Sequence, residues 1–131
     1  MKKEDLKRII AKNDPNLHER AREEGWKIRY NKRSDMLLIG NKFPKGSFYT
    51  YVLDTGFMLR IDKNETIHGY AIENAKYFIR QNAEIGFVLY PFVYPIRAKI
   101  LFAISRMLRN TSDLFKVFTV NNYVSTTLCR I

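Results

Sequence analysis

The first 25 residues follow a helical pattern of apolar positions, which recur every three or four residues. These positions are Leu6, Ile9, Ile10, Leu17 and Ala21. The pair Asp14-Pro15 predicts the start of a second helix, with Asp14 as its N-cap and Pro15 in its first position. Gly25 predicts the C-terminal stop of that helix. We therefore expect two consecutive N-terminal helices on the surface of the remaining chain.

From Trp26 onward, apolar residues alternate with polar ones, which is the period of a half-buried strand. Five such segments follow one another and are separated by turn residues. They cover residues 26–30, 36–39, 48–53, 57–61 and 66–72. Because the turns between them are short, we expect an antiparallel meander in which each strand pairs with the next one in sequence.

The C-terminal half predicts two helices, a strand and a hairpin. Residues 73–82 have helical spacing, and residues 86–90 fit a further strand. Pro95–Asn110 has a broad apolar arc and is the clearest helix in the chain. Residues 114–120 and 123–129 flank two asparagines, which tolerate the positive φ of a hairpin turn. The expected fold is one α+β domain over residues 1–131, with an antiparallel β-meander, N-terminal helices, a packed central and C-terminal helix, and a C-terminal β-hairpin.

Composition narrows the class of protein. The chain has 131 residues, of which 46% are hydrophobic and 27% charged, as is typical of a packed globular domain. Its single cysteine, Cys129, excludes an intrachain disulfide and any multi-cysteine metal site. We therefore expect a cytoplasmic protein. The longest apolar run, Ile85–Ile96, is shorter than the roughly 20 residues of a membrane span, so none is expected.

The positive charge is concentrated at the two ends of the sequence. The formal net charge is +10, and residues 34–86 carry as many acidic as basic side chains. The excess lies in residues 1–33 and 87–131. Such ends favour an acidic partner, which is nucleic acid, an anionic membrane surface or an acidic protein. A general need for solubility explains the same excess without any partner.

The predicted helix over Pro95–Asn110 has a second arc, opposite the apolar one, where an aromatic ring lies among cations. This arrangement suits a phosphate backbone with a stacked base, although any solvated helix also carries basic residues opposite its apolar face. The predicted nucleic-acid-binding residues are Arg29, Arg33, Lys99, Phe102, Arg106 and Arg109. Further aromatic residues offer either a stacking surface or ordinary core: Tyr49, Tyr51, Tyr90, Phe92 and Tyr94.

Catalytic chemistry has weak support. His68 is expected to lie opposite Leu59 as a partly buried core residue, and His18 to be solvated on its helix. The two histidines form an acid–base pair for RNA cleavage only if the fold brings them together. Residues 62–66 superficially match the Asp-x-Asn-x-Thr pattern that begins a calcium loop, but a hairpin tip explains Asp62 and Asn64 there without a metal. The sequence has no phosphate-binding or dinucleotide-binding glycine motif, so it predicts no catalytic residue, no metal and no cofactor.

Two stretches carry a recognisable pattern. Tyr30, Asp35, Leu37 and Ile39 fit Tyr-x4-Asp-x-Leu-x-Ile, and residues 67–72 fit Ile-x-Gly-x-x-Ile. Together they resemble a family of short uncharacterised proteins built on a small antiparallel β-meander. The resemblance covers about residues 28–76 and departs from the family at Arg60, where that family tends to be acidic. It implies the meander and supplies no catalytic residue.

The first functional hypothesis is a small non-enzymatic basic module that contacts nucleic-acid phosphates with little sequence discrimination. It requires the basic ends of the chain to converge in space. Three alternatives remain: a protein-interaction or self-associating module that uses an aromatic sheet edge or the C-terminal hairpin, a small nuclease-type hydrolase, and peripheral membrane attachment through the helix over Pro95–Asn110. No small-molecule substrate is indicated.

Overall fold

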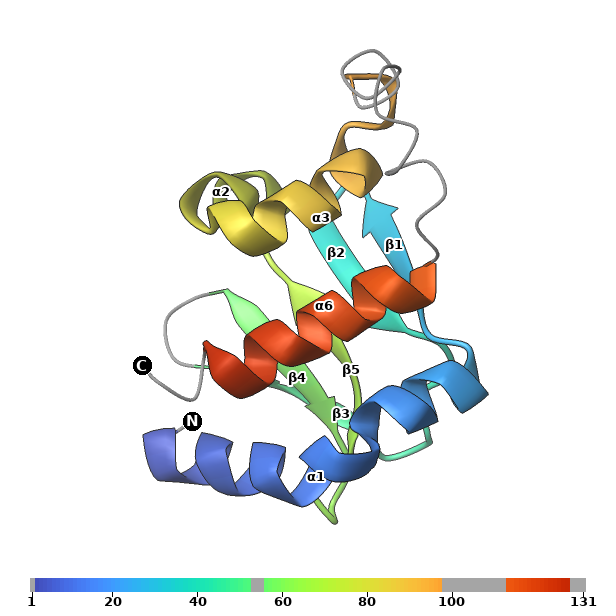
Figure 1. Ribbon diagram of the computed structural model, residues 1–131, viewed down its shortest axis with the longest axis vertical. Helices are drawn as coiled ribbons and strands as arrows, with labels where there is room; N and C mark the ends of the chain where they lie inside the picture. The colour runs from blue at the N-terminus through green and yellow to red at the C-terminus, as the bar shows by residue number, and fades with distance from the viewer. Residues whose placement is uncertain (1, 53–55, 98–112, 128–131) are drawn as a thin grey trace.

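The structure combines an antiparallel sheet with helices that pack against it (Figure 1). The computed structural model describes residues 2–52, 56–97 and 113–127. Within these ranges the predicted α+β class is confirmed. The helices and strands are α1 (Lys3–Glu24), β1 (Lys27–Asn31), β2 (Met36–Gly40), β3 (Phe48–Tyr51), β4 (Phe57–Ile61), β5 (Ile67–Ile72), α2 (Ala75–Gln81), α3 (Ala83–Val93) and α6 (Asp113–Thr126).

The strand order of the sheet is β1-β2-β5-β4-β3, and every neighbouring pair is antiparallel. The β1–β2 hairpin and the β3–β4–β5 meander agree with the prediction. The strictly sequential order is wrong, because β5 lies between β2 and β4. Burial gives the physical reason. β5 is buried along almost its whole length, whereas β1 and β3 have exposed positions. The central place covers both edges of this buried strand and leaves the strands with exposed positions outside.

The two helices predicted on either side of Pro15 form one continuous helix, α1. Buried apolar side chains lie both before and after Pro15: Leu6, Ile9, Ile10, Leu17 and Ala21. Packing of such a face supplies most of a helix's stability, so the backbone hydrogen bond that proline removes does not divide it. Gly25 ends the helix as predicted, with φ +66° and its N–H 3.3 Å from the carbonyl oxygen of Arg22.

The core lies between the sheet and the helices. Tyr70 of β5 donates a 2.6 Å hydrogen bond from its hydroxyl to Asn121 Oδ1 of α6. The ring of Phe57 on β4 lies 6.1 Å from the ring of Phe78 on α2 and 6.1 Å from that of Tyr123 on α6. These strand residues therefore define the face of the sheet that the helices cover.

The strand predicted over residues 86–90 is wrong, because this segment belongs to the helix α3. Ile85, Leu89 and Val93 are buried, and their spacing of four residues places them on one side of a helix. The apolar run contained this spacing, but its Phe, Val and Tyr residues also favour strands.

The predicted C-terminal hairpin is also wrong within the described residues, since 113–126 form the helix α6. Its buried valines lie three and four residues apart: Val117, Val120 and Val124. Asn121, expected in the turn, is buried and hydrogen-bonded to Tyr70 inside the core. The end of the predicted hairpin, with Cys129, lies outside the described residues. So does the predicted helix over Pro95–Asn110, apart from residues 95–97, which are helical.

Candidate functional site

The turn between β1 and β2 is tied to the start of α2 by Asp35. The hydroxyl of Tyr30 donates a 2.7 Å hydrogen bond to Asp35 Oδ1, and the backbone N–H of Lys76 lies 3.3 Å from the same oxygen. The carbonyl oxygen of Asp35 accepts a 3.0 Å hydrogen bond from the N–H of Ala75. Burial, followed by the hydrogen bond to Asp35, raises the pKa of Tyr30 to about 12. Both residues of the Tyr-x4-Asp pattern therefore join structural elements.

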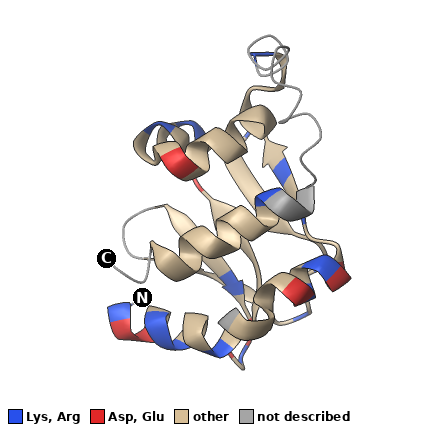
Figure 2. Ribbon diagram, viewed as in Figure 1, with Lys and Arg blue, Asp and Glu red and all other residues tan. Residues whose placement is uncertain are grey.

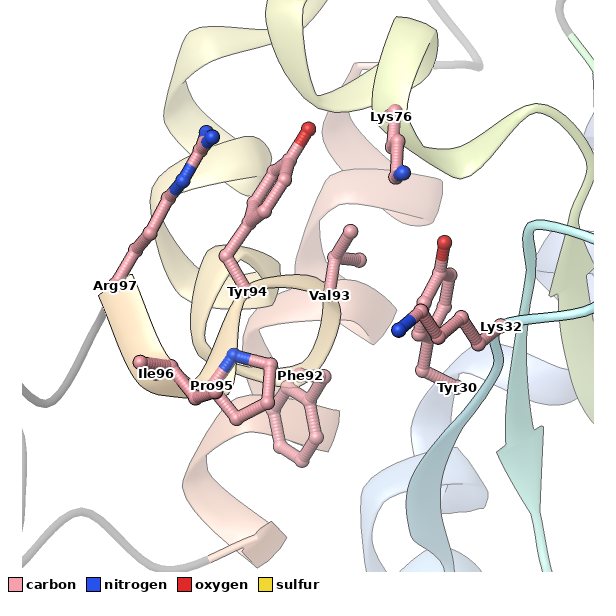
Figure 3. A pocket seen from close by; sticks show the side chains of 9 residues that line it. All are labelled: Tyr30, Lys32, Lys76, Phe92, Val93, Tyr94, Pro95, Ile96 and Arg97. Carbon is pink, nitrogen blue, oxygen red and sulfur yellow. The ribbon is translucent and has the colours of Figure 1, made fainter.

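Beside this junction lies a pocket of about 430 Å³ between the β1–β2 turn and the end of α3. Figure 3 shows three basic side chains around it, each from a different part of the chain. Lys32 comes from the β1–β2 turn, Lys76 from α2 and Arg97 from the segment after α3. The remaining lining residues are aromatic or aliphatic: Tyr30, Phe92, Val93, Tyr94, Pro95 and Ile96. We call Lys32, Lys76 and Arg97 the pocket cations.

Two of the pocket cations lie over the ring of Tyr94. The Nζ of Lys76 is 5.8 Å and the Cζ of Arg97 is 5.0 Å from its centroid. The ring of Tyr94 packs in turn on Tyr90, with 4.9 Å between the centroids. Within the described ranges none of the pocket cations forms an ion pair with a carboxylate. The pocket therefore combines aromatic lining residues with three basic side chains that form no ion pair in the described part of the chain.

A fourth cation lies next to the pocket. The Nζ of Lys116 on α6 is 4.8 Å from the centroid of Phe92, one of the lining residues. The helix that the sequence did not predict thus adds a basic side chain to this end of the molecule.

The residues predicted to bind nucleic acid lie in different places. Arg33 is exposed in the β1–β2 turn and follows Lys32 in the sequence, but it does not line the pocket. Arg29 is exposed on β1 but points to the other face of the sheet from Tyr30, because side chains alternate along a strand. The remaining four lie outside the described residues: Lys99, Phe102, Arg106 and Arg109.

Sequence reasoning missed Lys76 and Arg97 as site residues. Each is a single basic residue without a local motif. Their convergence depends on the strand order and on the helical path of α3, neither of which was predicted. Tyr94 and Phe92 were noticed as aromatic residues, and only the fold brings them beside the pocket cations.

The N-terminal helix α1 adds no basic side chain to the pocket cations. It lies at the opposite end of the sheet from residues 95–97, and its basic and acidic residues alternate (Figure 2). Arg8 forms ion pairs with Asp5 at 2.9 Å and Glu65 at 3.0 Å, and Arg22 pairs with Glu19. Local carboxylates therefore neutralise much of the charge that the sequence assigns to this end of the chain.

His68 does not lie opposite Leu59, which pairs with Tyr70 instead. The β4–β5 pairing has a bulge between Arg60 and Ile61, and His68 is its extra residue. The imidazole Nε2 lies 2.9 Å from Asp62 Oδ2, and the side chain is 12% exposed. His68 thus has a structural contact within the β4–β5 hairpin.

The two histidines make no contact with each other in the described part of the chain. The prediction that His18 is solvated is wrong, because its side chain is partly buried and its ring packs edge-on against Phe118 of α6, with 4.6 Å between the centroids. The calcium-like pattern forms a hairpin tip, in which Asp62 Oδ1 accepts hydrogen bonds from the N–H groups of Asn64 at 2.8 Å and Thr66 at 3.1 Å. Residues 2–52, 56–97 and 113–127 contain no cluster of three or more His, Cys, Asp or Glu side chains able to hold a metal ion.

Comparisons of the chain with models of protein families, with curated proteins and with solved structures give no match. None of the helices that the structure describes has the length and apolar character needed to cross a membrane.

Proposed function

We propose that this protein is a small non-enzymatic binding module that holds nucleic acid through its phosphates, with little sequence discrimination. The pocket cations and the neighbouring Arg33 supply the positive charge. Three of the predicted nucleic-acid-binding residues follow Arg97 in the sequence: Lys99, Arg106 and Arg109.

One observation carries this proposal. Three elements bring Lys32, Lys76 and Arg97 to the rim of one pocket, and none of the three forms an ion pair with a carboxylate of the described residues. Concentrating like charges costs free energy in the unbound protein, and a polyanion relieves this repulsion while it releases its own counterions. The tyrosine rings below the charges add a surface on which a base or sugar packs.

The chemistry of the lining favours contacts with phosphates over reading of bases. Ammonium groups on flexible stems act as point charges and adapt to many phosphate positions. Asn, Gln, Asp and Glu, which read adenine or cytosine edges, are absent from the lining residues. We therefore expect similar affinity for different sequences.

The test is a titration of the full chain with fluorescently labelled oligonucleotides of mixed sequence at several salt concentrations. If about six phosphates are contacted, the affinity falls by about three decades between 50 and 200 mM salt. Lys76→Ala lowers the slope of log affinity against log salt by about one. Lys63→Ala, an exposed lysine at the β4–β5 hairpin tip, leaves the slope unchanged. Absent or salt-independent binding of the wild-type chain overturns the proposal.

A second candidate function is self-association, which the edge strand β3 favours. In the part of the chain that the structure describes, β3 pairs on one side only, with β4. Phe48 and Tyr51 on this strand are 49% and 50% exposed, and unpaired strand edges with exposed aromatic rings tend to recruit another chain. Light scattering distinguishes the two functions: a mass that rises with protein concentration, and that neither salt nor nuclease changes, supports self-association.

A further inference from the structure

The sheet has a second face, opposite the one that packs on the helices. Side chains alternate along a strand, so the neighbours of the core residues Phe57, Leu59 and Tyr70 point the other way. The register of the sheet places the following residues on this second face: Lys27, Arg29, Leu38, Ala71, Met58, Arg60, Tyr49 and Tyr51. We call this set, together with Phe43 of the β2–β3 loop, the outer face.

The outer face holds an arginine between two aromatic rings. The Cζ of Arg60 lies 4.9 Å from the ring centroid of Phe43 and 4.6 Å from that of Tyr49. Its Nε donates a 2.8 Å hydrogen bond to the Oγ of Ser47. Among the described residues its two Nη groups have no hydrogen-bond or ion-pair partner. The guanidinium is therefore fixed in place, and its terminal donors remain available for an anion.

A glycine pair makes room for this arrangement. The ring of Phe43 lies over Gly40 and Gly69, which are opposite one another on β2 and β5. A Cβ at Gly40 would lie 2.8 Å from the ring of Phe43, and one at Gly69 would lie 3.0 Å from it. Without those Cβ atoms, the β2–β3 loop can bring its aromatic ring down onto the sheet beside Arg60.

Tyr51 supplies an exposed ring two residues from Tyr49 on the same face. It is 50% exposed, and its hydroxyl donates a 2.7 Å hydrogen bond to the Oε1 of Glu73. The hydrogen bond fixes the direction of the side chain while much of the ring remains accessible. A ring held in this way loses little conformational entropy when a flat ligand stacks on it.

The charge of the outer face matches a polyanion. Its register positions include three cations, Lys27, Arg29 and Arg60, and the carboxylate of Glu73 reaches its edge through Tyr51. Phosphates and bases together require separate cationic and aromatic groups on one surface, and sheets that bind RNA single strands combine them in this way.

From this placement we infer that the outer face binds a single strand of nucleic acid, with a base stacked on Tyr51 and phosphates bound by Arg60 and Arg29. The inference rests on the proposed function and names its preferred ligand. It adds the outer face as a second contact surface, on the side of the sheet opposite Tyr30 of the pocket. In a duplex both faces of each base are covered by neighbouring base pairs, so a duplex offers this surface only its phosphates. We therefore expect the protein to prefer single strands.

The experiment measures the affinity of the full chain for labelled single-stranded and duplex oligonucleotides of equal length. It is repeated with the variants Tyr51→Ala and Phe48→Ala. The two side chains have nearly equal exposure on the same strand but point to opposite faces of the sheet. Tyr51→Ala is expected to weaken single-strand binding by roughly 5- to 150-fold, the cost of one lost stacking contact, and to change duplex binding little. Phe48→Ala leaves both unchanged.

A second variant, Arg60→Gln, removes the charge and is expected to lower the salt slope for single strands by about 0.7. Far-ultraviolet circular dichroism and urea unfolding establish that each variant is folded.

The outcomes separate this inference from the proposed function. If the wild-type chain binds single strands and duplexes equally, and Tyr51→Ala binds both as the wild type does, the inference is overturned while the proposed function stands. If the wild-type chain binds neither, both fail. If light scattering shows a dimer that Tyr51→Ala dissociates without a change in single-strand binding, the outer face is a self-association surface and the inference is overturned.

Discussion

Asn13 is a buried polar side chain that makes several hydrogen bonds in the core. It is 6% exposed, and its Nδ2 donates to the carbonyl oxygens of Ile9 and Glu65, while its Oδ1 accepts from the N–H of Ile67. The side chain thereby joins α1 to the start of β5. Asn13→Leu keeps the branched shape of the side chain but leaves buried backbone groups without partners, so we expect a loss of about 2–4 kcal/mol of unfolding free energy. Urea unfolding measures this loss.

The matched control for this change is Asn16→Leu, an exposed position on the same helix, which should shift stability by less than about 0.5 kcal/mol. Equal effects of the two substitutions would show that the hydrogen bonds of Asn13 do not hold α1 to the sheet.

Asp62 makes the stability of the fold depend on pH. The hydrogen bond from His68 is the largest of the effects that lower the pKa of Asp62 below its usual value, 3.8. A carboxylate with a lowered folded-state pKa stabilises the fold above about pH 4, and this contribution is lost as the pH falls through the lowered pKa. Asp62→Asn should therefore cost about 1 kcal/mol near neutral pH and progressively less in acid.

The measurement is urea unfolding of wild type and Asp62→Asn from about pH 7 down to about pH 2.5. The exposed Glu4→Gln serves as the control and should give a smaller variation over this range, because among the described residues Glu4 interacts only with the first turn of α1. A difference for Asp62→Asn that stays constant across the range would contradict the role of its charge.

The α2–α3 corner depends on the absence of a side chain at Gly86. A Cβ at this position would lie 2.4 Å from the carbonyl oxygen of Ile79 and 3.1 Å from its Cα. Gly86→Ala raises helix propensity by about 1 kcal/mol but forces α2 and α3 apart. We expect the steric effect to dominate, with a net destabilisation of about 1–3 kcal/mol in thermal or urea unfolding. In the control Asn122→Ala, at an exposed site of α6, propensity acts alone and stabilises by a few tenths of a kcal/mol.

The strands were predictable and two of the helices were not. Alternation of apolar and polar residues is a local signal, and the five strand positions were identified to within one or two residues. The helices α3 and α6 contain many Val, Phe, Tyr and Thr residues, which favour strands. They are helical because Ile85, Leu89 and Val93, and the three buried valines of α6, bury one side against the rest of the protein. This tertiary gain outweighs intrinsic propensity.

The arrangement of the whole molecule decides which charges act together, and local sequence patterns did not predict this arrangement. It identified Arg29 and Arg33 as exposed cations, but it also assigned the N-terminal basic residues to the same surface. The strand order places the β1–β2 turn beside the ends of α2 and α3, where Lys32, Lys76 and Arg97 meet. Formal net charge therefore overstates the number of cations available to one ligand.

This difference between total charge and local charge gives a prediction with a matched control. Two triple variants each remove three positive charges and therefore have the same net charge. The pocket variant combines Lys32→Ala, Lys76→Ala and Arg97→Ala, and the N-terminal variant combines Lys2→Ala, Lys3→Ala and Lys7→Ala. Counterion release depends on the phosphates actually neutralised, at about 0.7 in salt slope per contact for a single strand. The pocket variant should therefore lose about two from the slope. The N-terminal lysines, which lie among Glu4 and Asp5 at the other end of the sheet, should contribute less than one. Equal losses in the two variants would mean that binding responds to the overall charge of the protein and not to the pocket cations.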